Sequence, residues 1–243
     1  MVSEHDLQWL KWNYPGIYYV PDKKILQGCL WFKMSYSFSS SQAVINPPDH
    51  INSNESLVIE DVFDLTIEID YSIKKATVRE VGGRILHTKS RWRLSNADVH
   101  MYQDGSLCLC PEPEEKLLFH EGFSLRTFFY SYLIPNLYYQ SYLGRFGKEP
   151  WRSSSHGPMG ILEGYVSQTI SKQPIKTVVG AYVECLPASL ERLILKKKVA
   201  PDLSCGCGST KKFRECHTLA FTGLKKLHAD YWVMRAGKSR KKE

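Results

Sequence analysis

Three cysteines and one histidine stand within a window of thirteen residues near the end of the sequence. The window runs Cys205-Gly-Cys207-Gly-Ser-Thr-Lys-Lys-Phe-Arg-Glu-Cys216-His217. Zinc in structural sites takes four nitrogen or sulfur ligands in a tetrahedron, all from protein side chains. The glycines let the backbone fold tightly around the first two sulfur atoms, and the basic residues offset the charge of three thiolates. The window predicts a structural Zn²⁺ site formed by Cys205, Cys207, Cys216 and His217, with a loop of free cysteines as the alternative.

A second candidate for sulfur chemistry is Cys108, which follows an Asp-Gly pair in the stretch His-Met-Tyr-Gln-Asp-Gly-Ser-Leu-Cys that begins at His100. The Asp-Gly pair predicts a tight turn. Such a turn places the thiol at a surface edge, where His100 could lie against it. Composition alone favours a small buried hydrophobic residue at Cys108, because free cysteine is among the most buried residue types. A nucleophilic thiol is the alternative.

A nucleophilic Cys108 would need a nearby cation or base, because a cysteine with a pKa of about 8.5 is only slightly ionised at neutral pH. His100 and His156 are the candidate catalytic histidines, and His120 is a weaker one. Each of them has a hydrogen-bonded structural role as its alternative. Cys110 points away from Cys108 in an extended segment and is expected to be a packing residue, like Cys29 and Cys185.

The chain's positive charge lies in its last 59 residues. Residues 1–184 contain 18 Lys+Arg and 20 Asp+Glu, whereas residues 185–243 contain 14 and 5. The apolar fraction of 43% and the charged fraction of 23% are typical of a globular chain and exclude a disordered or collagen-like one. The odd number of cysteines and an amino terminus without a basic, apolar leader predict a cytoplasmic protein.

The elements that must position these residues are predicted from hydrophobic periodicity. A helix over residues 4–14 is followed by segments with strand character, which favours an α+β fold with an antiparallel meander. Strand character fades between residues 87 and 100. The uncharged stretch 127–144 holds five tyrosines and predicts a buried helix rather than a membrane span. The predicted strands are 25–38, 57–69 and 76–81, and the predicted later helices are 124–146 with a break near Pro135, 161–171 and 188–198.

The cysteine window resembles the SEC-C motif, whose pattern is C-x-C-G-S-x-K-[KR]-[FY]-x-x-C-[CH]. Every position of that pattern is filled over about residues 201–220, with His217 as the fourth ligand. The resemblance implies a zinc-binding module that contacts partners and is not catalytic. A basic zinc module could instead bind nucleic acid, although basic terminal runs are more often solvated. Nucleic acid is therefore not an expected partner, and no membrane partner is expected.

The stretch from His100 to Leu109 resembles the active-site segment of bacterial ubiquitin-conjugating (UBC-fold) enzymes, which reads H-x-x-x-D-G-S-L-C-L. The resemblance spans about residues 5–165 and implies that Cys108 carries a thioester. One departure is that Met101 and Tyr102 follow the histidine where eukaryotic enzymes have Pro-Asn. Stabilisation of an oxyanion would then come from backbone amides, Tyr102 or a histidine. Transfer to a lysine is accordingly less firmly implied than thioester formation.

Together the two motifs resemble the conjugating-enzyme-like proteins of cyclic-oligonucleotide-based anti-phage signalling systems (CBASS). By that resemblance the chain is a cysteine acyltransferase. Cys108 would accept the C-terminal tail of a cGAS-like nucleotidyltransferase and pass it to a protein acceptor. The chain has no nucleotide-binding glycine motif, so an activated donor must come from elsewhere. A non-catalytic adaptor that binds protein or nucleic acid through the zinc module is the alternative. The expected domains are residues 1–165 (UBC-like), 166–200 (helical) and 201–243 (zinc motif and basic tail).

Overall fold

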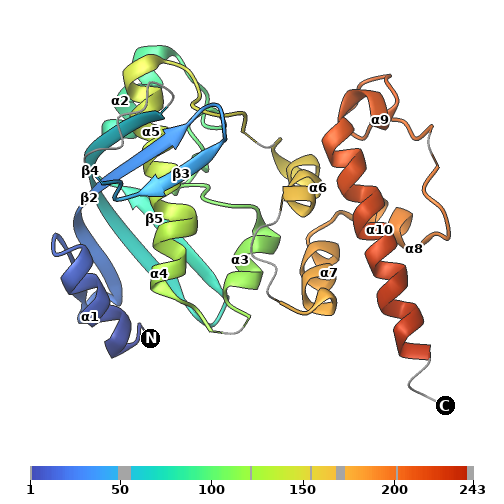
Figure 1. Ribbon diagram of the computed structural model, residues 1–243, viewed down its shortest axis with the longest axis horizontal. Coiled ribbons are helices and arrows are strands. Elements are labelled where there is room, and N and C mark those ends of the chain that lie inside the picture. Colours follow the sequence, from blue (N-terminus) through green and yellow to red (C-terminus); the bar gives the residue numbers. More distant parts are fainter. Residues whose placement is uncertain are drawn as a thin grey trace. The chain divides into compact units, whose positions relative to one another are not determined.

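The computed structural model of the chain describes residues 2–48, 56–120, 122–153, 155–167, 173–200 and 202–239, apart from the side chains of residues 167 and 237–239. These residues form two compact units (Figure 1). The first comprises residues 1–110 and 118–153, and the second comprises residues 111–117 and 154–243. The expected boundaries at residues 165 and 200 differ from this division, because the helices after residue 156 and the cysteine window share one hydrophobic core.

An antiparallel sheet forms the centre of the first unit. Its strands lie in the order β1-β2-β4-β5, and β3 pairs with the carboxyl-terminal end of β2. The predicted α+β meander after a first helix is confirmed, and β1 and β3 add to the expected strands. The elements are α1 (Glu4–Asn13), β1 (Ile17–Val20), the 3-10 turn η1 (Pro21–Lys23), β2 (Ile25–Ser37), β3 (Gln42–Ile45), β4 (Ser56–Asp70) and β5 (Lys75–Glu80).

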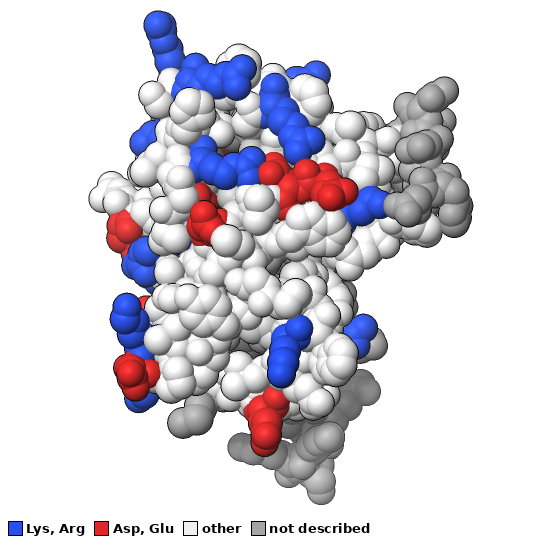
Figure 2. All heavy atoms as spheres, turned by 90° about the vertical axis from the view of Figure 1, so that its left-hand side faces the viewer, with Lys and Arg blue, Asp and Glu red and all other residues white. Residues whose placement is uncertain are grey.

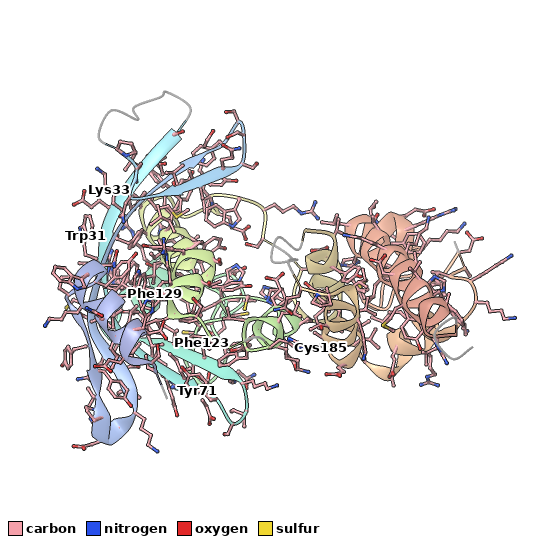
Figure 3. The ribbon with its side chains drawn as sticks, turned by 60° about the horizontal axis from the view of Figure 1, so that its bottom comes forward. Trp31, Lys33, Tyr71, Phe123, Phe129 and Cys185 are labelled. Carbon is pink, nitrogen blue, oxygen red and sulfur yellow. The ribbon has the colours of Figure 1, made fainter. Side chains whose placement is uncertain are left out.

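The two faces of the sheet differ in their exposure to solvent. Side chains of β4 point alternately to the two faces. Phe63 and Leu65 are buried on the inner face, which the helices cover, whereas Val62 is exposed on the opposite, open face. Trp31 and Lys33 of β2 project from this open face (Figure 3).

The first unit has 15 Lys+Arg and 15 Asp+Glu, and side chains of both signs lie next to one another in Figure 2. The chain's net charge of +7 therefore belongs to the second unit.

Helices cover the inner face of the sheet. α2 (Arg84–Trp92) follows β5, which explains why strand character fades in this part of the sequence. The predicted helix 124–146 consists of α4 (Leu125–Phe128), the π-helix η2 (Phe129–Leu133) and α5 (Ile134–Phe146). The wide turn of η2 directly precedes Pro135, which has no backbone N–H to donate to the preceding turn. Phe129 of η2 lies on the helix side of the sheet (Figure 3).

The second unit is helical. It contains α3 (Glu112–Leu118) except its last residue, together with α6 (Gly157–Ser167), α7 (Ile175–Glu184), α8 (Ala188–Leu195), α9 (Phe213–Cys216) and α10 (Thr218–Ser239). α6 and α10 approach closely at Gly223, where a Cβ atom would lie 1.8 Å from the carbonyl oxygen of Leu162. Most of the segment that was expected to be a zinc motif and basic tail is α10, whose Leu224 and Leu227 are buried in the core. Residues 168–171 of the predicted helix 161–171 lie outside the described residues.

The aromatic stretch 127–144 is buried as predicted, because most side chains of α5 from Ile134 to Leu143 are inaccessible to solvent. In the part of the chain that the structure describes, no helix combines the length and the apolar character needed to cross a membrane.

Asp61 is a charged residue on the inner face of the sheet, and it ties two helices to the sheet. The carboxylate of Asp61 in β4 is 12% exposed. Arg84 of α2 donates to both of its oxygens at 2.7 and 2.8 Å, and Ser141 of α5 donates at 2.8 Å. Burial by itself would raise the pKa of Asp61, but the hydrogen bonds from Arg84 and Ser141 outweigh it and lower the pKa to about 2.

We expect Asp61→Asn to lower the free energy of unfolding at pH 7 by about 2 kcal/mol, because the carboxylate's pKa lies below its ordinary value. The contribution of Asp61 is present above about pH 4 and disappears as the pH falls toward about 2, where the folded protein protonates it. Urea unfolding of the wild type and of Asp61→Asn at pH 7 and at about pH 2 measures the difference in the free energy of unfolding. Asp64→Asn is the matched control, because Asp64 belongs to the same strand but is exposed on the open face. An equal effect of Asp61→Asn at both pH values would contradict the assignment.

Candidate functional site

The turn before Cys108 is built by its own sequence. Asp104 accepts hydrogen bonds from the backbone N–H and the hydroxyl of Ser106, at 3.0 and 2.6 Å. Gly105 has a φ of +81°, which a residue without a side chain adopts without strain. The N–H of Tyr102 donates to the carbonyl of Ser106 at 2.8 Å and closes the turn. The tight turn predicted from Asp-Gly is confirmed.

Cys108 leaves this turn between two backbone hydrogen bonds. Its own N–H donates to the carbonyl of His100 at 2.7 Å, and the N–H of buried Leu107 donates to Val78 of β5 at 2.8 Å. Cys108 itself is partly exposed. Its thiol takes part in no hydrogen bond with any residue that the structure describes. Cys108 is thus a partly exposed residue whose backbone is held by hydrogen bonds.

His100 reaches Cys108 with its backbone rather than with its ring. The ring nitrogen Nε2 lies 3.1 Å from the hydroxyl oxygen of Ser153, and the ring lies edge-on to Tyr139, with 4.8 Å between centroids. His100 also has a φ of +44°, in the left-handed region that residues with a side chain rarely occupy. His100 thus lies across the turn from Cys108, as expected, but its backbone carbonyl makes the contact.

The other candidate histidines are not brought to Cys108 within the first unit. His156 is an exposed residue of the second unit, just before α6. His120 belongs to the first unit and is exposed after α3. The role of His156 as a catalytic base stays a prediction.

Sequence reasoning missed the polar side chains of α5 that bind this segment. Asn136 donates to the carbonyl of Cys108 at 3.4 Å, Gln140 donates to Val99 at 2.8 Å, and Tyr139 donates to Asp98 at 3.0 Å. Asn136 and Gln140 are buried. The available signal was two carboxamides, four residues apart, in an otherwise apolar and aromatic helix.

Cys29 and Cys185, which were expected to be packing residues, have polar partners. Cys29 is exposed on the open face of the sheet, where its thiol donates to Asp64 at 2.7 Å and that hydrogen bond raises its pKa. The expectation that Cys29 is a packing residue is therefore wrong. Cys185 is partly buried at the end of α7 (Figure 3), and burial raises its pKa to about 11 although Lys116 faces it. Neither thiol is poised as a nucleophile at neutral pH.

The four predicted ligands meet in the second unit. The ligand atoms of Cys205, Cys207, Cys216 and His217 all lie within 4.8 Å of one another. The sulfur of Cys205 is 3.2 Å from Nδ1 of His217, and the sulfurs of Cys207 and Cys216 are 3.6 Å apart. This cluster could hold a metal ion.

A short hairpin and a single helical turn bring the ligands together. The N–H of Cys205 donates to Lys211 at 3.0 Å, and the N–H of Phe213 donates to Leu203 at 2.7 Å. Buried Phe213 begins α9, which ends with Cys216 and is followed directly by His217. The sequence therefore supplies one ligand pair from the hairpin and one from the helix.

The charges around the cluster differ from the expected arrangement. Lys212 and Arg214 form ion pairs with Asp202, at 3.0 and 3.4 Å, although they were expected to offset the thiolates. Hydrogen bonds from the side chain and backbone of Ser209 lower the pKa of Cys207 to about 6. Hydrogen-bond donors, more than neighbouring cations, thus favour the thiolate at this ligand.

Comparison of the chain with models of protein families, with curated proteins and with solved structures finds no match.

We expect the purified protein to carry about one equivalent of a divalent metal ion, and Cys205→Ser to reduce this below about 0.2 equivalents, because losing one of four ligands weakens binding strongly. Elemental analysis of protein purified without chelators measures both. Cys185→Ser removes a thiol of the same unit outside the cluster and should leave the metal content unchanged. Wild-type protein with less than half an equivalent, or equal losses in both variants, would exclude the site.

Proposed function

We propose that the chain is a ubiquitin-conjugating-like cysteine acyltransferase that carries an acyl group as a thioester on Cys108. The observation that carries the proposal is the placement of this thiol. It is partly exposed, its backbone is held by His100, and it forms no hydrogen bond of its own with the described residues. Cys29 and Cys185, by contrast, have polar partners and raised pKa values. The α+β meander that precedes the turn agrees with the proposed UBC-like fold.

The proposed reaction needs a carboxyl group that another protein has already activated as an adenylate or a thioester. The Cys108 thiol loses its proton, and its sulfur attacks the carbonyl carbon. A carbon–sulfur bond forms, and the bond from that carbon to the adenylate oxygen or to the donor sulfur breaks. An amine can attack the new thioester in the same way and release the thiol. His100 positions the nucleophile through its carbonyl in this scheme. His156 stays a predicted base.

The proposed donor is the C-terminal tail of a cGAS-like nucleotidyltransferase, within an anti-phage signalling system, and the proposed acceptor is an amine of a protein. Both follow from the resemblance of the stretch from His100 to Leu109 to the bacterial conjugating enzymes. Flexible C-terminal tails suit a thiol on a surface turn, because an extended chain end can reach a partly exposed side chain without unfolding either partner.

We further propose that the Cys/His cluster is a SEC-C-like structural zinc module. Three thiolates and an imidazole are the ligand types that zinc prefers, and a Zn–S bond of about 2.3 Å puts tetrahedral ligand atoms about 3.8 Å apart. The separations of 3.2 and 3.6 Å in the cluster are close to this value. Bound zinc would cross-link the hairpin of Cys205 and Cys207 to the α9–α10 junction. The three ligand thiols would then be poor nucleophiles.

A second candidate function is supported by charge. The second unit has 17 Lys+Arg and 10 Asp+Glu, while the first has a net charge of zero. A basic unit with a metal cluster can bind acidic protein or nucleic acid, so the chain could be a UBC-like adaptor without turnover. Under this function, Cys108 would carry no adduct.

We expect a glycine-terminated peptide thioester to transfer its acyl group to the wild-type protein and to Cys110→Ser, giving an adduct that thiol reductants remove. In Cys108→Ser the reductant-sensitive adduct should disappear, with a slower, reductant-resistant ester in its place, because an oxygen ester resists attack by thiols. Intact-protein mass spectrometry before and after reductant distinguishes the two adducts.

Cys110→Ser serves as the matched control, since it removes a thiol two residues away from the same segment. Absence of any adduct on the wild type, or its persistence as a thioester in Cys108→Ser, would exclude the acyltransferase and leave the adaptor.

A further inference from the structure

One helix of the first unit binds both arms of the Cys108 turn. Gln140 and Tyr139 of α5 donate to Val99 and Asp98 on the arm that enters the turn, and Asn136 donates to the carbonyl of Cys108 on the arm that leaves it. Asn136 and Gln140 are one helical turn apart and therefore lie on the same face of α5. The two arms are also joined to each other by the hydrogen bond from Cys108 to His100.

The two carboxamides are costly to bury. Asn136 is 8% exposed and Gln140 is 3% exposed. The side-chain oxygen of each is buried and accepts no hydrogen bond from any residue that the structure describes. A leucine or methionine of similar volume would remove the unpaired oxygen, but it would also take away the donor that binds the carbonyl of Cys108 or Val99. Each carboxamide therefore holds the Cys108 segment through its NH2 group while its own oxygen stays unpaired.

Backbone strain in the same segment is a second, independent observation. His100 has a φ of +44°. Gln140 binds the carbonyl of the preceding residue, Val99, and the carbonyl of His100 itself accepts the hydrogen bond from Cys108. A side-chain-bearing residue keeps such a conformation only where its surroundings impose it, and such residues cluster at functional sites. The hydrogen bonds from α5 are part of what imposes it here.

We propose that Asn136, with Gln140, is the positioning residue of Cys108. Asn136 holds the carbonyl of the cysteine itself, and Gln140, with the shorter bond of 2.8 Å, anchors the residue before His100. Together they fix the direction in which the Cys108 side chain leaves the backbone. That this direction serves acyl transfer rests on the proposed function, whereas the order of the turn does not.

The experiment compares Asn136→Leu with Tyr138→Phe in the full chain. Tyr138 of α5 donates to the carbonyl of Leu57 in β4. Its substitution therefore removes a comparable hydrogen bond from the same helix to the backbone, but not one to the Cys108 segment. Amide hydrogen exchange of the peptide covering residues 98–110 should be about five-fold faster in Asn136→Leu and unchanged in Tyr138→Phe. Unchanged exchange in Asn136→Leu, or an equal increase in both variants, would overturn the proposal. If Asn136→Leu fails to fold, Gln140→Met gives the same test.

A second readout separates positioning from general loosening. Acyl loading of Cys108 from the peptide thioester should fall about five-fold in Asn136→Leu, while alkylation of Cys108 by iodoacetamide stays within about two-fold of wild type. A structural role would move both rates together or neither, and either result would overturn the proposal. If the wild type never loads while exchange changes as expected, the proposed acyl transfer fails and the positioning of the turn stands.

Discussion

The placement of Cys108 depends on hydrogen bonds between backbone carbonyls and a helix, and not on contacts of the thiol. α5 reaches the sheet on one side through Tyr138 and Ser141, and it reaches the Cys108 turn on the other through Asn136 and Gln140. Because the same rigid helix makes both sets of bonds, the turn is held in register with the sheet. His100, with its left-handed φ of +44°, lies within that frame.

The two proposed roles of the cysteines belong to two different units. The first unit, with zero net charge, presents Cys108 on a surface turn. The second unit, which is basic, gathers three thiols and His217 into one cluster. A metal ion on that cluster would take its thiols out of reaction with electrophiles, so the two sites would not compete for an acyl donor.

Short-range features were predictable from the sequence. The Asp-Gly turn before Cys108, the long strands β2 and β4 and the four clustered ligands each follow from local residue order. Features set by distant contacts were not. Asn136 acts on a carbonyl 28 positions earlier, and Cys29 is exposed because the outer face of the sheet is uncovered at Asp64. The helix α10 was not predicted, because the lysines of this segment obscure the helical spacing of its buried residues Leu224 and Leu227.

The most direct test of the account is the rate at which each of the seven cysteines takes an acyl group from a glycine-terminated peptide thioester. Peptide mass spectrometry resolves the rates on the wild-type, metal-loaded protein. The account predicts that Cys108 is acylated ahead of every other cysteine. Faster acylation of Cys29, Cys185 or a cysteine of the metal cluster would contradict it.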